Sequence, residues 1–225
     1  KTMSSSEIDA LLTHEAQSVQ IPYIVIGLVV LSVAAILWKT NLPEIKESSD
    51  ENSATEKGSI FKQTNLMLGV LAQFFYVGAQ VCVSSFFIRF LGKTAGIGEK
   101  EAAGYLAFAL LCFMLGRFLG TFLMKYIAPN RLLAVYSIFN IGLLAVAIMI
   151  GGFTSIYALI GVEFFMSIMF PTIFAMGISN LGEETKIASS FIVMSIVGGA
   201  IFPLFMGQIS DATCGNIQLA YIVPI

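Results

Sequence analysis

Long apolar runs are the feature of this sequence that most limits its possible folds. Because a bilayer core holds no water to satisfy backbone groups, a crossing helix needs about 20 largely apolar residues. Hydrophobic residues make up 57% of the 225-residue chain and charged residues 12%, against about 25% charged in a soluble domain. We therefore predict an all-α integral membrane protein with six transmembrane helices and the start of a seventh. The helices are expected over residues 21–38, 65–91, 103–127, 132–152, 156–178 and 187–209, with the seventh from residue 217.

The connections between these runs predict the order of the helices across the membrane. Residues 39–63 are rich in Lys, Glu, Ser and Asn, a composition that buries too little apolar surface to order itself. The other connections are short, which favours antiparallel neighbours. Basic residues gather on the linker side, so this side is predicted to be cytoplasmic. They are Lys39, Lys46, Lys57, Lys62, Lys125, Arg131 and Lys186, against Lys1, Lys93, Lys100 and Arg89 on the other side.

The sequence lacks the residue patterns that are typical of several function classes. A net charge of −2 and the lack of a dense basic block argue against a nucleic-acid partner. The cysteines, Cys82, Cys112 and Cys214, are too far apart for a zinc spacing, and the single His14 lies outside the apolar runs. No catalytic triad, metal-ligand spacing or phosphate-binding loop is recognisable. We expect neither an enzyme nor a bound cofactor or metal.

Polar residues inside the second apolar run follow helical spacing. Gln73, Tyr76, Gln80 and Ser84 are separated by three, four and four residues, so their side chains share one helix face. A buried amide without a partner is costly, so this stripe is expected to face the protein interior. It could line a hydrated cavity for a hydroxyl-rich solute, or it could form hydrogen bonds that hold the bundle together.

Glu163 is the acidic residue in the middle of the fifth run. A charge at this depth is costly unless it is paired, hydrated or protonated, so Glu163 is a candidate functional residue. The alternative is a structural pair with Arg117 or with an amide on a neighbouring helix. Asn140, in the fourth run, is a weaker candidate because one Asn can simply bridge two helices.

Glycines and prolines in the runs predict close packing and bends. Gly116 and Gly120 have the G-x-x-x-G spacing that lets helix backbones approach. Pro171 lies inside the fifth run and Pro203 inside the sixth; each removes a backbone donor, so both helices are expected to bend. In a membrane, such bends occur where protein or a hydrated cavity satisfies the freed backbone groups.

Five stretches carry a family resemblance: "LAQFFYVGAQ", "SFFIRF", "GRFLGTFLMKYIAP", "FFMSIMFPTIFAMGISNLGEETK" and "SSFIVMSIVGGAIFPLFMGQISD". Together they resemble the L-fucose:proton symporter family of the major facilitator superfamily, which also contains glucose/galactose permeases. The similarity extends from about residue 21 to the last residue.

This resemblance implies a twelve-helix, two-bundle carrier that alternates its access to a central sugar site. It assigns residues 1–20 to an extracytoplasmic loop, 21–38 to the last helix of the first half-bundle, 39–63 to a cytoplasmic linker and 64–225 to the second half-bundle, truncated in its last helix. The chain is thus expected to be a C-terminal half fragment. The family's main proton-coupling carboxylates belong to the first half-bundle and have no counterpart in this sequence.

The expected function is import of a monosaccharide, L-fucose or a related hexose such as glucose or galactose, by proton symport across a bacterial inner membrane. The expected partners are the sugar, protons and the lipid bilayer, and the carrier is expected to act as a monomer. The candidate sugar-binding residues are Gln73, Tyr76, Gln80, Asn140 and Glu163, and Glu163 is also the candidate proton carrier.

Two other functions are compatible with the same spans. One is a major facilitator exporter of amphipathic small molecules, since the Met and Phe residues around Pro171 could form a pliable apolar pocket. The other is a transporter-like receptor that binds a solute without moving it.

Overall fold

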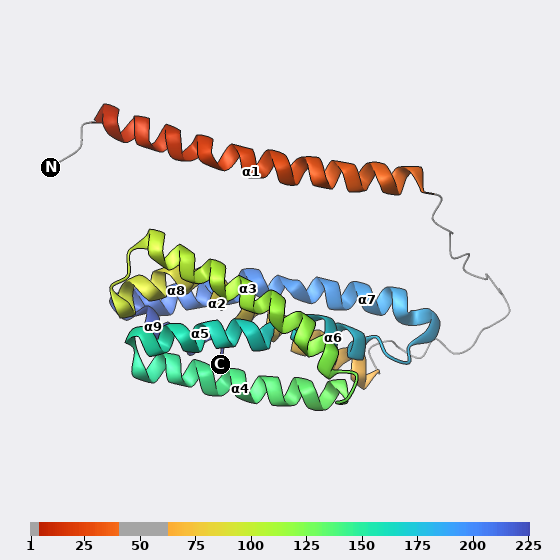
Figure 1. Ribbon diagram of the computed structural model, residues 1–225. Coiled ribbons are helices and arrows are strands. Elements are labelled where there is room, and N and C mark those ends of the chain that lie inside the picture. Colours follow the sequence, from red (N-terminus) through yellow and green to blue (C-terminus); the bar gives the residue numbers. More distant parts are fainter. Residues whose placement is uncertain (1–4, 41–62) are drawn as a thin grey trace. The chain divides into compact units, whose positions relative to one another are not determined.

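The computed structural model describes residues 5–40 and 63–225. Within these residues all regular structure is helical, and six helical segments are long and apolar enough to cross a membrane (Figure 1). The prediction of an all-α protein with six spans is therefore confirmed. The chain divides into two units, Lys1–Thr55 and Glu56–Ile225, which we describe separately.

The first unit contains the helix α1 (Ser5–Lys39), whose apolar part is Gln20–Lys39. Every residue of this apolar part is exposed, as expected of a helix whose surroundings are lipid or other helices. The helix begins at Ser5, whereas we expected a loop over residues 1–20. Most of the expected linker, residues 41–62, lies outside the described residues.

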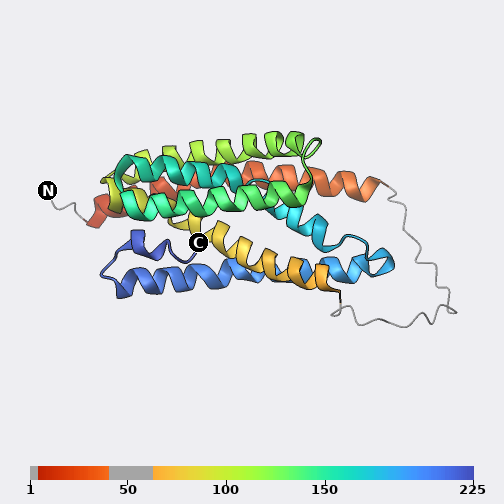
Figure 2. The same ribbon diagram turned by 90° about the horizontal axis from the view of Figure 1, so that it is seen from below.

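The second unit is a bundle organised around α2 (Thr64–Ala95), which contacts α3, α5, α6, α8 and α9. Figure 2 shows the long helices of this bundle running alongside one another. The remaining elements are α3 (Glu99–Leu123), α4 (Pro129–Ile150), α5 (Gly152–Met166), α6 (Met169–Gly177), η2 (Gly182–Glu184), α7 (Thr185–Met194), η3 (Ser195–Val197), α8 (Gly198–Ala212) and α9 (Ile217–Ala220).

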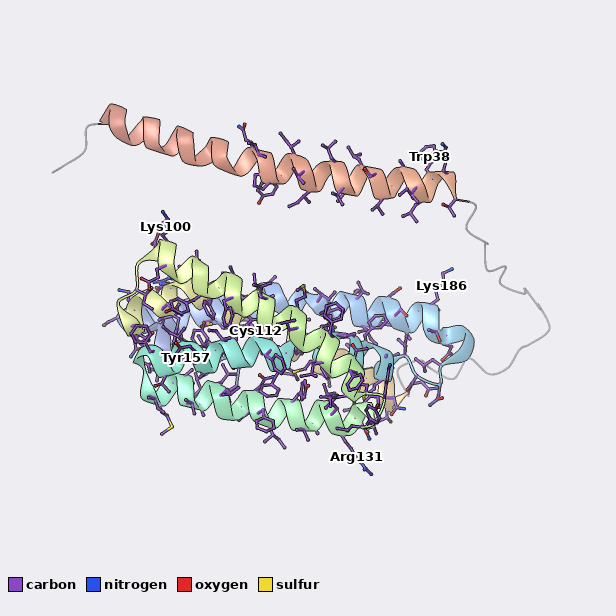
Figure 3. The ribbon with its side chains drawn as sticks, in the orientation of Figure 1. Trp38, Lys100, Cys112, Arg131, Tyr157 and Lys186 are labelled. Atoms are coloured by element: carbon purple, nitrogen blue, oxygen red, sulfur yellow. The ribbon has the colours of Figure 1, made fainter. Side chains whose placement is uncertain are left out.

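The two ends of this bundle differ in their basic residues. Figure 3 shows Arg131 and Lys186 at one end and Lys100 at the opposite end, as the alternation of loops requires. Apolar side chains cover the helix surfaces between the ends. The arrangement agrees with the expected sidedness, and the cytoplasmic location of the Arg131 end remains a prediction.

Both spans that contain an internal proline have an irregular segment. The fifth span is interrupted between α5 and α6, at Ser167 and Ile168, just before Pro171. The sixth span changes to a 3-10 turn at Ser195–Val197 before α8 begins at Gly198, so its irregular turn lies ahead of Pro203 rather than at it. The expected start of a seventh span is the short α9, which turns follow.

Small residues bring α3 close to the fifth span, as the G-x-x-x-G spacing predicted. Gly116 and Gly120 are both buried. A methyl group added at Gly116 would come 2.6 Å from the carbonyl oxygen of Phe164 and 2.7 Å from the hydroxyl of Ser167. The backbone of α3 therefore lies directly against the end of α5.

This contact predicts that Gly116→Ala destabilises the bundle, because a backbone carbonyl has no room to yield. We expect the free energy of unfolding to fall by about 1 to 3 kcal/mol, measured by denaturant titration in detergent. Gly104→Ala on the same helix is the matched control, since nothing lies within 4 Å of its added methyl group. Equal stabilities of the two variants would contradict the packing role of Gly116.

Candidate functional site

An open pocket of about 280 Å³ lies on the second unit, between α2, α4 and the fifth span. Its polar lining comes from Tyr76 on α2 and from Ser137 and Asn140 on α4, which share one face because they are three residues apart. The rest of the lining is apolar: Ala72, Phe75, Ala79, Leu133, Ile141, Leu144, Met166, Met169, Ile173, Pro224 and Ile225. A few polar groups on an apolar wall are typical of small-molecule sites.

Tyr76 connects this pocket to the break in the fifth span. Its hydroxyl donates a hydrogen bond of 2.7 Å to the carbonyl oxygen of Met166, the last residue of α5. The side chain is only 6% exposed, so it forms part of both the pocket wall and the bundle core. The hydroxyl oxygen can still accept a hydrogen bond from a solute.

Asn140 has unused hydrogen-bonding capacity in the same pocket. Its Nδ2 donates to the sulfur of Met169 at 3.4 Å, and its Oδ1 has no partner among the described residues. A thioether is a weak acceptor, and a buried amide without good partners is costly. Because Oδ1 is itself buried, a solute hydroxyl could donate to it only after a side-chain movement that uncovers it.

Glu163 is fully buried on α5 and faces α2 rather than the pocket. Its Oε1 accepts a 2.7 Å hydrogen bond from the hydroxyl of Ser84, and its Oε2 has no partner among the described residues. The suggested pairing with Arg117 is not the contact that forms, because Arg117 donates to the carbonyl of Ser167 instead. Two members of the polar stripe, Tyr76 and Ser84, thus bond to α5.

The remaining stripe residues lie apart from the pocket. Gln73 is fully buried, and neither of its amide atoms has a hydrogen-bond partner among the described residues. Gln80 is half-buried and does not belong to the pocket lining. Of the five candidate sugar-binding residues, the structure brings Tyr76 and Asn140 together in one pocket; Gln73, Gln80 and Glu163 lie elsewhere in the helices.

Two residues of this site were not among the sequence candidates. Ser137 lies one helical turn before Asn140, and its hydroxyl donates to the carbonyl of Leu133 at 2.9 Å. Met169 receives the Asn140 amide. The spacing of Ser137 and Asn140 is visible in the sequence, whereas the contact with Met169 depends on how α4 and the fifth span meet.

No protein-family model matches the chain, but similar individual proteins are known. It is 40% identical to the L-fucose-proton symporter of Escherichia coli over 234 residues, which cover 99% of this chain and 52% of that protein. It is 40% identical to a putative glucose/galactose transporter of Helicobacter pylori, covering 99% of this chain and 54% of the relative. A glucose/galactose transporter of Brucella abortus is 35% identical, with 98% and 54% covered.

Solved structures of the same group match the fold. The crystal structure of the Escherichia coli fucose:proton symporter gives a TM-score of 0.78 at 38% identity, covering 99% of this chain and 55% of that one. A second crystal structure, of a major facilitator superfamily transporter in the outward conformation, gives 0.76 at 39% identity and the same coverage. This chain spans about half the length of the curated relatives it matches.

The hydrogen bond of Tyr76 predicts a stability effect that needs no ligand. Tyr76→Phe leaves the carbonyl of Met166 without its donor, so we expect the free energy of unfolding to fall by about 1 to 2 kcal/mol. Tyr157→Phe on α5 is the matched control, because Tyr157 is 63% exposed, and it should be neutral. A denaturant titration measures the free energy of unfolding of both variants. If Tyr76→Phe left this free energy unchanged, the hydrogen bond would contribute nothing to stability.

Proposed function

We propose that this chain belongs to the L-fucose-proton symporter family of the major facilitator superfamily and forms part of a carrier that imports a monosaccharide with protons. The observation that carries the proposal is the 40% identity, over 99% of the chain, to proteins named as fucose and glucose/galactose transporters. The carrier would lie in a bacterial inner membrane and alternate its access from side to side.

In this proposal each segment of the chain has a place in a two-bundle carrier. The apolar part of α1 is the last helix of the first half-bundle, residues 39–63 are the cytoplasmic linker, and residues 64–225 belong to the second half-bundle. The pocket on the second unit would then be one wall of the central sugar site. The similarity covers both units of the chain, which supports this division.

The chemistry of the pocket supports a small hydroxylated solute. Asn140 and Ser137 on α4 and the Tyr76 hydroxyl would bind sugar hydroxyls, while Met166 and Met169 contact its C–H faces. At about 280 Å³ the pocket is near the lower end of ligand pockets, about 300 to 1,000 Å³, and this size favours a monosaccharide. A sugar contact by Gln73 or Gln80 would require an access state in which α2 exposes these residues.

Glu163 has the surroundings of a proton carrier rather than of a sugar ligand. It lies one helical turn before Met166 on α5, with one carboxyl oxygen bonded to Ser84 and the other without a partner among the described residues. An ionised carboxylate in this apolar interior is costly, and a protonated carboxyl costs much less. If the two access states differ in how they solvate Glu163, its protonation biases the equilibrium between them.

Transport itself is tested with the complete carrier in sealed vesicles. We expect uptake of labelled fucose, glucose or galactose, and we expect an inward proton gradient to stimulate it. If none of the three sugars exchanged with or without the gradient, the proposal would be wrong. Competition by hydrophobic cations but not by sugars would instead support the exporter of amphipathic compounds, which the names of the relatives do not favour.

A substitution at Glu163 separates sugar movement from proton coupling. Glu163→Gln keeps the size of the side chain and an acceptor for Ser84 but removes the exchangeable acid. We expect sugar exchange at equal concentrations to persist, while accumulation driven by a proton gradient falls by tenfold or more, that is by about 1.4 kcal/mol of coupling free energy or more. Glu101→Gln, at the exposed start of α3, is the control. Unchanged uptake at every pH would remove Glu163 from the coupling mechanism.

A further inference from the structure

The break in the fifth span lies beside the pocket. α5 ends at Met166 and α6 begins at Met169, and both methionines line the pocket. The angle at which the two helices meet therefore sets where these side chains lie. The features that hold the break in place are also features that shape the pocket.

Pro171 explains which backbone group the break leaves without a donor. In a regular α-helix the N–H of residue 171 would bond to the carbonyl four residues earlier, which is that of Ser167. Proline has no N–H, and its ring also crowds that carbonyl. The carbonyl of Ser167 consequently needs a donor from outside the helix, since no water replaces one in an apolar interior.

Arg117 supplies this donor from α3. Its Nε lies 3.2 Å from the carbonyl oxygen of Ser167. Gly116, the preceding residue, allows the approach, because its missing side chain leaves room for the end of α5. The guanidinium carbon of Arg117 also lies 5.2 Å from the ring centre of Phe113, one turn earlier on the same helix, a cation–π contact that helps to hold the side chain.

The carbonyls on either side of Ser167 are satisfied by other residues. The Tyr76 hydroxyl donates to the carbonyl of Met166 at 2.7 Å. The carbonyl of Ile168 accepts from the backbone N–H of Thr172 at 3.2 Å and from its hydroxyl at 2.6 Å. Each of three successive carbonyls thus has its own donor, and only that of Ser167 depends on Arg117.

We propose that Arg117 is a positioning residue of the pocket: its guanidinium replaces the backbone donor that Pro171 lacks and thereby holds the break that places Met166 and Met169. Arg117 itself is not part of the pocket lining. It acts through the backbone of the fifth span, and its role depends on the presence of Pro171.

This dependence makes the role testable without any substrate. Arg117→Met keeps most of the length of the side chain but has no donor, and Pro171→Ala restores a backbone N–H for the carbonyl of Ser167. We expect Arg117→Met to lower the thermal midpoint of the complete carrier in detergent by roughly 2 to 4 °C. In the Pro171→Ala background the same substitution should lower the midpoint by less than half as much.

The control variant and the results that would overturn the proposal use the same comparison of thermal midpoints with and without Pro171→Ala. Arg131→Met, at the exposed start of α4, should have the same effect in both backgrounds. An Arg117→Met loss that is equal in the unmodified carrier and in the Pro171→Ala background would overturn the proposal. If Arg117→Met gives no folded carrier, recovery of folded protein in the double variant supports the proposal, and failure to recover it overturns the proposal.

A second measurement concerns the pocket and rests on the proposed sugar transport. Arg117→Met should raise the KM for the transported sugar about three- to tenfold with a smaller change in maximal rate, and Pro171→Ala should restore it. A KM that Pro171→Ala does not restore would contradict the positioning role. If the unmodified carrier moves no sugar, the proposed function fails, and the thermal comparison still decides the role of Arg117.

Discussion

Every backbone N–H and carbonyl that lies within a bilayer must find a partner inside the protein, and this requirement governs the whole structure. Where the spans are regular, the helix itself supplies the partners. Where the fifth span breaks, the side chains of Tyr76, Arg117 and Thr172 donate to its carbonyls, together with the backbone N–H of Thr172. The cost of an unsatisfied carbonyl in an apolar medium, several kcal/mol, explains why these contacts converge on so short a segment.

Polar side-chain atoms in an apolar interior also need partners, so the buried atoms that have no partner among the described residues are candidates for function. Asn140 belongs to the pocket lining, although its Oδ1 atom is itself buried. Glu163 accepts from Ser84 of α2 with Oε1, and its Oε2 has no partner within the described part of the chain. We interpret the first as capacity for a solute hydroxyl and the second as a site for an exchangeable proton. Gln73 has the same unused capacity but lies outside the pocket lining.

The short helix α5 carries both Glu163 and a residue of the pocket lining. Its residue Met166 lines the pocket and accepts from Tyr76, while Glu163, one turn earlier, accepts from Ser84. Both donors belong to α2, so a shift of α5 along α2 changes both contacts together. In a carrier, such a rigid connection would let a protonation event and a binding event favour the same arrangement of helices.

The sequence by itself determined the class of protein and the positions of its spans, because the length and apolarity of a crossing helix are local properties. The expected second span, residues 65–91, lies within α2 (Thr64–Ala95), and the presence of Pro171 predicted that the fifth span is irregular. The sequence also identified the polar residues that are costly in a membrane. These inferences needed no knowledge of which helices touch.

Only the tertiary structure decided which polar residues share a site. Tyr76 and Gln73 lie on one helix face, yet Tyr76 lines the pocket and Gln73 does not, since membership depends on what packs against each turn of α2. A pair between Arg117 and Glu163 was one of the alternatives that the sequence left open. The close approach of the helices at Gly116 instead brings Arg117 to the backbone carbonyl of Ser167. Such choices depend on the rotation and crossing of helices distant in sequence, and periodicity along one helix carries no information about them.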